Sequence, residues 1–240
     1  MAKKVLFPNG IPEGYSGNEE DPGIVMAILL YFSTYIFPIL FTISIYLSVK
    51  NLIDSSSYLS LIIAFPIAWI GGDFLSGLIH WACDTYGTVN TPILGHALIR
   101  NFRSHHTYPK DICVSPIPFI VGYVAIVALF TLTPLILILK DSNSFSLSIF
   151  TFIYAIITFL TVLTNLFHKW THEDNVPSWV TFLQNKKIIL SPEHHKFHHT
   201  YPFNSNYCIT HGLTNPFLEK IGFFRKFEFL LLKLGFKPDI

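Results

Sequence analysis

Histidines are concentrated in four short motifs of this 240-residue chain, and their spacing suits metal binding. On a helix, residues four positions apart lie on the same face, about one turn apart. That spacing joins the first and last residues of HWACD and of HKWTH, and it recurs within SPEHHKFHH, while FRSHH ends in two adjacent histidines. The candidate metal ligands in these motifs are His80, Asp84, His105, His106, His168, His172, His194, His195, His198 and His199.

The composition of this set indicates which metal site to expect. Imidazole nitrogen binds iron, zinc and copper, and carboxylate oxygen also suits iron and manganese. So many imidazoles beside one carboxylate exceed the four ligands of a tetrahedral zinc ion, which indicates two metal ions. For His194 and Asp84 the alternative is a supporting position, in which the side chain orients a ligand. His96 and His211 stand apart from the motifs and are predicted to lie on the surface or beside the ligands.

The composition indicates a membrane protein. Hydrophobic residues make up 51% of the chain and charged residues only 13%, whereas soluble domains carry about 25% charged residues. A net charge of +1 gives no basic surface of the kind that nucleic-acid-binding proteins present. Three widely spaced cysteines without a CxxC motif do not form a disulfide framework, and they fit reduced thiols facing the cytosol.

Four apolar stretches are long enough to cross the roughly 30 Å hydrocarbon core of a bilayer, which takes about 20 residues. The predicted spans are about 24–49, 58–82, 115–139 and 143–167. Basic residues before the first span, between the second and third, and after the fourth place both termini and the middle loop in the cytosol. The eleven histidines all fall at the ends of spans or in segments assigned to the cytosolic side, although they were not used to assign the topology.

The C-terminal stretch from Pro216 to Phe236 mixes aromatic, apolar and basic residues, which favours a helix lying in the membrane interface. The alternative is that this stretch packs against the histidine-rich region. The predicted fold is therefore an all-α integral membrane protein: four transmembrane helices, a cytosolic histidine-rich cap for two metal ions, and a C-terminal interfacial helix.

The motifs resemble those of the Kua family of membrane lipid desaturases. Between about Gly71 and Gly222 the chain contains GGDFLSGLIHWACDTYG, IRNFRSHH, NLFHKWTH, SPEHHKFHH and NYCITHG in the order typical of that family. The resemblance implies a lipid desaturase domain, which we place at 24–222. The polar stretch 1–23, with proline and glycine, is predicted to be a cytosolic tail, and 223–240 is predicted to be an interfacial segment. The resemblance also implies two Fe ions held by the ten candidate ligands, O2 as co-substrate, and a catalytic role for every candidate except His194.

The reaction implied by the resemblance is insertion of a C=C bond into a lipid chain, foremost the vinyl-ether bond of plasmalogens, made from plasmanylethanolamine. The plasmanyl-type members tend to carry a histidine where this chain has Phe203. A fatty-acyl desaturase or hydroxylase acting on another phospholipid is therefore the alternative. Arg100, Arg103 and Lys196 are candidates for contact with a lipid phosphate, or serve only to set the topology.

A metal-binding membrane protein without redox chemistry, such as a transporter or sensor, is the non-enzyme alternative. A transporter is expected to place ionisable residues near the bilayer midplane, and the four predicted spans place none there. The sequence contains neither a GxGxxG dinucleotide fingerprint nor a CxxCH haem site. Electrons are therefore predicted to come from a separate donor protein, either cytochrome b5 or a ferredoxin with its reductase.

Overall fold

The computed structural model describes residues 13–17, 22–92 and 94–239, and all regular structure within these ranges is helical. This agrees with the predicted all-α class. The described residues form two compact units. The first unit contains 13–17, 74–92, 94–115 and 167–239, and the second contains 22–73 and 116–166. The predicted N-terminal tail at 1–23 lies largely outside the described residues.

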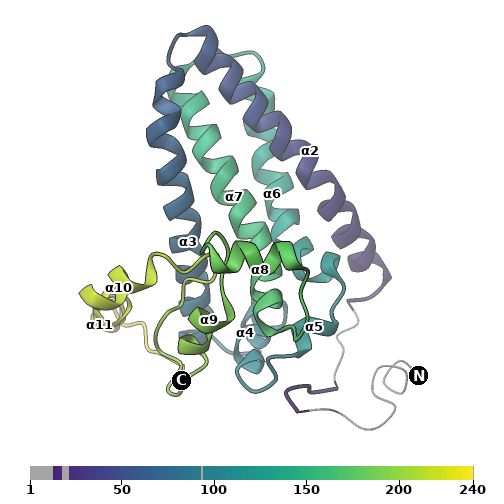
Figure 1. Cartoon of the computed structure of the whole chain (residues 1–240), viewed down its shortest axis with the longest axis vertical. Helices are drawn as coiled ribbons and strands as arrows, with labels where there is room; N and C mark the ends of the chain where they lie inside the picture. Colours follow the sequence, from purple (N-terminus) through teal and green to yellow (C-terminus); the bar gives the residue numbers. More distant parts are fainter. Residues whose placement is uncertain (1–12, 18–21, 93, 240) are drawn as a thin grey trace. The chain divides into compact units, whose positions relative to one another are not determined.

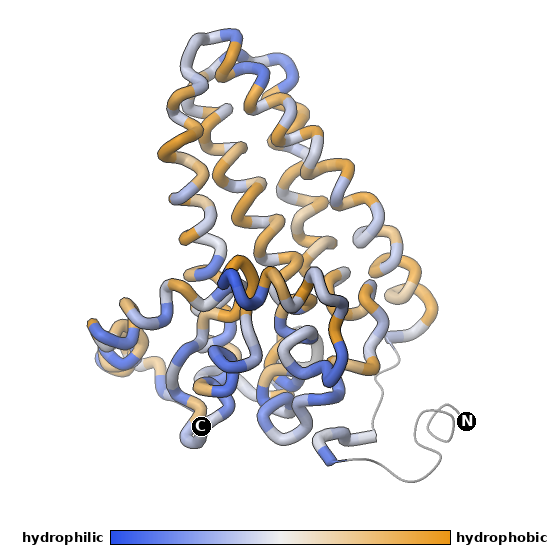
Figure 2. Tube along the Cα trace, viewed as in Figure 1, coloured by the Kyte–Doolittle hydropathy of each residue, from blue (hydrophilic) through white to orange (hydrophobic). Residues whose placement is uncertain are grey.

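Among the described residues, four helices are long and apolar enough to cross a membrane, as predicted. They are α2 (Ile24–Asp54), α3 (Leu61–Thr85, preceded by the 3₁₀ turn η1, Tyr58–Ser60), α6 (Ile117–Leu139) and α7 (Phe145–His172). Their apolar composition is seen in Figure 2, where the trace of the four helices is orange over long runs. The last helix continues five residues beyond the predicted end at 167, so that it includes both histidines of HKWTH.

Small residues bring these helices together within the second unit, where they lie side by side (Figure 1). Ala64 and Ala68 of α3 pack against Phe152, Ile156 and Leu160 of α7. A Cβ atom at Gly122 of α6 would clash with Leu30 of α2, and the hydroxyl of Ser33 in α2 donates a hydrogen bond to the Gly122 carbonyl at 3.0 Å. Small residues and polar contacts of this kind are what allow helices to associate in lipid.

The first unit contains the ends of α3 and α7 and a set of shorter helices. These are the π-helical turn η2 (Gly95–Ile99), α4 (Arg100–His105), α5 (Asp111–Val114), α8 (Ser178–Asn185), α9 (Pro192–His198), α10 (Asn215–Ile221) and α11 (Phe223–Lys233). Helix α9 begins after an N-cap: the Ser191 hydroxyl accepts a hydrogen bond from the backbone N–H of His194. Proline at the next position has no N–H to satisfy and favours the first turn.

The C-terminal stretch forms two helices rather than one. Gly222 adopts a left-handed conformation with φ of 62°, which ends α10 and lets α11 leave in a new direction. Helix α11 packs one face against the end of α3, where Phe224 and Trp81 are both buried. The indole N–H of Trp81 donates a hydrogen bond to Glu228 at 2.6 Å. The histidine-bearing end of α3 is thus covered by the C-terminal helix.

Candidate metal centre

Nine of the ten candidate ligands gather into two groups, both within the first unit. In each group, one potential ligand atom from every member lies within 4.8 Å of the others. The five-histidine group consists of His105, His168, His172, His195 and His199. The aspartate group consists of His80, Asp84, His106 and His198. No residue belongs to both groups, so each group presents a separate set of donors.

Two of the long helices, α3 and α7, each supply one group with a pair of ligands one turn apart. The pair on α7, His168 and His172, belongs to the five-histidine group, whereas the pair on α3, His80 and Asp84, belongs to the aspartate group. The spacing of four residues places both members of each pair on one helix face, as the sequence predicted.

The two shorter motifs divide their histidines between the groups. On α9, His195 and the C-capping His199 lie one turn apart and join the five-histidine group, while His198 joins the aspartate group. At the end of α4, His105 joins the first group and the following residue, His106, joins the second. The two groups are therefore neighbours connected by two pairs of adjacent residues.

Ring nitrogens converge at the centre of the five-histidine group. The Nε2 atom of His105 lies 2.9 Å from that of His172 and 3.1 Å from that of His199. The Nε2 atoms of His172 and His168 are 3.3 Å apart. A neutral imidazole has a single N–H, so hydrogen bonds among these rings leave nitrogen lone pairs that a cation would bind.

Two members of the groups are buried without hydrogen-bond partners. Both ring nitrogens of His195 and both carboxylate oxygens of Asp84 lack such a partner. The Asp84 Oδ2 atom lies 3.3 Å from Nε2 of His80 and 3.6 Å from Nε2 of both His106 and His198. Burial of an unpaired carboxylate is costly, and a bound cation would offset that cost. Both donor sets therefore fit a metal ion.

Backbone carbonyls fix the tautomers of two histidines in the aspartate group. The Nδ1 atom of His80 lies 3.1 Å from the carbonyl oxygen of Tyr207, and Nδ1 of His198 lies 2.9 Å from that of Ser205. A carbonyl oxygen only accepts hydrogen bonds, so each Nδ1 carries the proton and each neutral ring keeps its lone pair on Nε2. Both Nε2 atoms face the Asp84 carboxylate, and Nε2 of His198 also lies 2.8 Å from Nε2 of His106, so these donors converge where one metal ion would bind.

Burial keeps the histidines of α4 and α9 in the neutral form that binds metal. Removal from water lowers the pKa of His106 and of His199 to about 4, and that of His198 to about 3. The pKa values of His105 and His195 are also lowered, chiefly by burial and further by neighbouring histidines. At neutral pH each of these rings is therefore neutral, with one N–H and one nitrogen lone pair that can bind metal.

The end of α3 is held close to the segment that follows α9. A Cβ atom at Gly77 would clash with the Sγ atom of Cys208, so glycine permits this approach. One residue earlier, the Ser76 hydroxyl accepts a hydrogen bond from the backbone N–H of Ile209 at 3.1 Å. These contacts place the Tyr207 carbonyl against His80. No sequence pattern predicts this support, because any residue type carries a backbone carbonyl.

His194 lies outside both groups and faces a different environment. Its Nε2 atom accepts a hydrogen bond from the Asn215 side-chain amide at 2.9 Å, which occupies the lone pair that a metal would need. Asn215 is itself held by the backbone N–H and carbonyl of Cys208. The geometry thus favours the supporting position that the sequence left open for His194.

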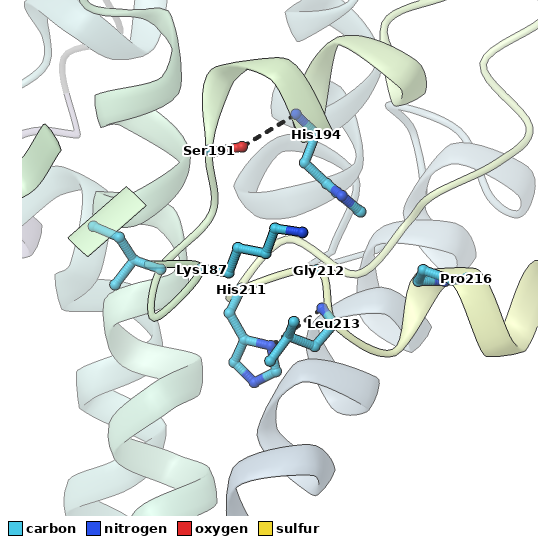
Figure 3. Close-up of a pocket in the computed structure, with 8 residues that line it drawn as sticks. Lys187, Ser191, His194, His211, Gly212, Leu213 and Pro216 are labelled. Carbon is cyan, nitrogen blue, oxygen red and sulfur yellow. Dashed lines mark hydrogen bonds between the residues drawn. The ribbon is translucent and has the colours of Figure 1, made fainter. Parts of the chain in front are cut away.

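Figure 3 shows the pocket that His194 lines together with Lys187, Ser191 and His211. His211, expected on the surface or beside the ligands, is 3% exposed, and its Nδ1 atom accepts a hydrogen bond from the backbone N–H of Leu213. The side chain of His96 lies outside the described residues. Arg103, a candidate for lipid phosphate contact, donates hydrogen bonds to the backbone carbonyls of Cys83 and Asp239.

Comparison with known proteins links this geometry to a family. Residues 69–239 match the model of the lipid desaturase domain. The chain is 39% identical over 183 residues to plasmanylethanolamine desaturase of Myxococcus xanthus, covering 71% of this chain and 60% of that protein. It is 40% identical over 172 residues to plasmanylethanolamine desaturase 1 of Mus musculus, covering 69% and 63%.

A plant relative is more distant. Identity to the chloroplastic fatty acid desaturase 4 of Arabidopsis thaliana is 31% over 199 residues, covering 82% of this chain and 59% of that protein. The aligned part thus spans about three-fifths of the length of each of these curated relatives. No solved structure matches the chain.

Proposed function

Because the chain belongs to the lipid desaturase domain family, we propose that it is an O2-dependent lipid desaturase that forms the vinyl-ether bond of plasmalogens from plasmanylethanolamine. The observation that carries this proposal is the pair of neighbouring ligand groups, which together present eight imidazoles and one carboxylate. The identity to two plasmanylethanolamine desaturases supports the choice of substrate.

The donor set supports two Fe ions as the metals. Imidazole and carboxylate ligands both suit iron, and the described residues of the two groups include no thiolate that would favour zinc or an iron–sulfur cluster. Bound iron would supply the power to activate O2 and remove hydrogen from an unactivated CH2 group. We assign His80, Asp84, His105, His106, His168, His172, His195, His198 and His199 as ligands, and His194 as a support for the segment around them.

The protein's own contribution is to hold these donors in position before the metals and substrate arrive. The carbonyls of Ser205 and Tyr207 orient two imidazoles, and burial keeps the α4 and α9 rings in the neutral form that binds metal. Preorganised ligands avoid rearrangement during reaction and restrict which carbon atoms of a bound chain are attacked. Exclusion of water from His80, His195 and His198, each at most 2% exposed, limits side reactions.

The distribution of basic residues supports a cytosolic position for both termini and for the loop between α3 and α6. We place a desaturase domain at 24–222 and an interfacial segment at 223–240. Helix α11 supports the interfacial assignment because its outer face exposes Phe229, Leu230 and Leu232, while its inner face packs against Trp81. Electrons would come from a cytochrome b5 or a ferredoxin with its reductase, since the sequence has no dinucleotide or c-type haem motif.

A fatty-acyl desaturase is the second candidate, favoured by the identity to a chloroplastic fatty acid desaturase and by Phe203. Expression in a host that makes 1-O-alkyl ethanolamine lipids but no vinyl ethers separates the two. The proposed activity yields acid-labile vinyl ethers in the extracted lipids, and the His172→Ala variant yields none. A new double bond in an acyl chain without vinyl ethers would establish the second candidate. Purified protein with zinc and no iron would contradict both.

A further inference from the structure

The segment Phe203–Tyr207, which follows α9, contains two residues in an unusual backbone conformation. Phe203 has φ of +62° and Asn206 has φ of +56°. A positive φ is uncommon for asparagine and is an outlier for a bulky residue such as phenylalanine. Such a conformation is strained and persists where surrounding contacts impose it. The contacts of this segment therefore indicate what the conformation is for.

The segment contacts every histidine of the aspartate group. The Phe203 ring stacks on the His106 ring, with centroids 4.8 Å apart and planes 7° from parallel. The Ser205 carbonyl lies 2.9 Å from Nδ1 of His198. The Tyr207 carbonyl lies 3.1 Å from Nδ1 of His80. Among the described residues, the segment makes no ring contact or hydrogen bond with the five-histidine group.

The C-terminal helices hold this segment in place. The backbone N–H of Asn206 donates a hydrogen bond to the Glu219 carboxylate of α10 at 3.1 Å. The buried Tyr207 ring packs edge-on against Phe224 of α11, with centroids 4.9 Å apart. A contact path thus leads from α10 and α11 through Phe203–Tyr207 to three ligands of one group.

We propose that Phe203–Tyr207 is a positioning segment for the aspartate group alone, setting the orientation of His80, His106 and His198 and thereby the metal affinity of that group. The inference rests on the proposed metal binding but not on the identity of the lipid. Groups that orient metal ligands typically change metal affinity by about 10–100-fold when they are removed. The stacked Phe203 ring is the contact that substitution can remove, because the carbonyls belong to the backbone.

The test is a titration of the purified, metal-free full chain with Co²⁺ in the presence of a competing chelator. Visible absorption monitors the bound Co²⁺. The His172→Ala background weakens the five-histidine group and isolates the aspartate group, and the His106→Ala background does the reverse. In the His172→Ala background, Phe203→Ala should weaken Co²⁺ binding by about 10–100-fold and change the absorption spectrum. In the His106→Ala background, Phe203→Ala should leave affinity and spectrum unchanged.

Three further variants separate positioning from damage to the fold. Phe203→Tyr keeps an aromatic ring over His106 and should restore wild-type affinity. Phe197→Ala removes a nearby exposed ring whose described ring contact is with His194, outside both groups, and should have no effect. Glu219→Ala should act in the same direction as Phe203→Ala, since it releases the Asn206 backbone.

The possible outcomes are distinct. Equal weakening of both groups, or no change in the aspartate group, would overturn the inference. A wild-type chain that binds no Co²⁺ would overturn both this inference and the proposed metal chemistry. A selective Phe203→Ala effect in a protein that forms no C=C bond would leave the positioning role intact and refute only the desaturase.

Discussion

His105 and His106 are adjacent in the chain, yet their rings enter different groups of ligands. The Nε2 atom of His105 lies 2.9 Å from that of His172, whereas Nε2 of His106 lies 2.8 Å from that of His198. His198 and His199 divide in the same way on α9. A shift of either backbone pair would move one ligand of each group, whereas a change in one side chain alters the ligand set of one group only.

The divided pair gives the first prediction. His105→Ala should weaken metal binding in the five-histidine group, and His106→Ala should weaken it in the aspartate group. We expect each metal affinity to fall by at least about 100-fold, because loss of a group that only orients a ligand already lowers metal affinity by about 10–100-fold. Each variant should keep the other site within about threefold of wild type. Co²⁺ absorption should show two different residual spectra. Identical residual spectra would contradict the division into two groups.

A second neighbouring pair tests the role of His194. His195→Gln should remove a ligand and abolish desaturation, because both nitrogens of His195 are buried in the five-histidine group without another partner. His194→Gln should retain both metal ions and most of the activity, because an amide oxygen can also accept the hydrogen bond from Asn215. Metal analysis and product formation check both variants. Loss of one metal equivalent from His194→Gln would restore His194 to the ligand set.

The lowered pKa values predict that the metal-free protein loses stability in acid. The unfolded chain protonates these imidazoles near 6.5, while His106 and His199 stay neutral in the fold down to about 4. Between those values the unfolded state binds more protons, so the free energy of unfolding falls as the pH falls from about 6.5 toward 4. Each such histidine contributes up to about 1.4 kcal/mol per pH unit.

Thermal unfolding of the metal-free chain in detergent, from pH 7.5 to pH 5, checks this direction. The double variant His106→Ala, His199→Ala should show a shallower dependence, because two of the titrating groups are gone. Stability that rises on acidification would contradict the burial of neutral imidazoles.

The docking of α11 gives a prediction about stability with a matched control. Phe224 is 4% exposed and packs against Trp81 and Tyr207, so Phe224→Ala should cost about 3–5 kcal/mol. Phe229, on the same helix, is 59% exposed, and Phe229→Ala should change stability by less than about 0.5 kcal/mol. Denaturation of the two variants in the same detergent gives the comparison. Equal effects would show that α11 is not seated on α3 through its Phe224 face.

Spacing predicted which residues lie on a common face but not which of two groups they join. His194 and His198 are four residues apart, as are His195 and His199. Only the second pair shares a group, because Asn215, far along the chain, binds the His194 ring. Local periodicity carries no information about such a distant partner, and the same limit applies to the carbonyls of Ser205 and Tyr207.

The apolar helices were more predictable because their signal is local. Uncharged runs of sufficient length predicted the four candidate spans. At most ends of these spans, the predicted boundary lies within a few residues of the helix end in the structure. The C-terminal stretch was less predictable, since its mixture of aromatic and basic residues fits both a membrane surface and a packed helix. The position of Gly222 explains why the stretch forms two helices.

The three cysteines are all free thiols, so no disulfide bond links distant parts of this chain. Metal ions bound at the two groups would crosslink the chain instead. The aspartate group alone joins His106 to His198, 92 positions away. A covalent link closing a loop of about 100 residues is worth roughly 4–5 kcal/mol through the entropy of the unfolded chain. A fold held together in this way would be insensitive to reducing agents that open disulfides and sensitive to chelators that remove its metal ions.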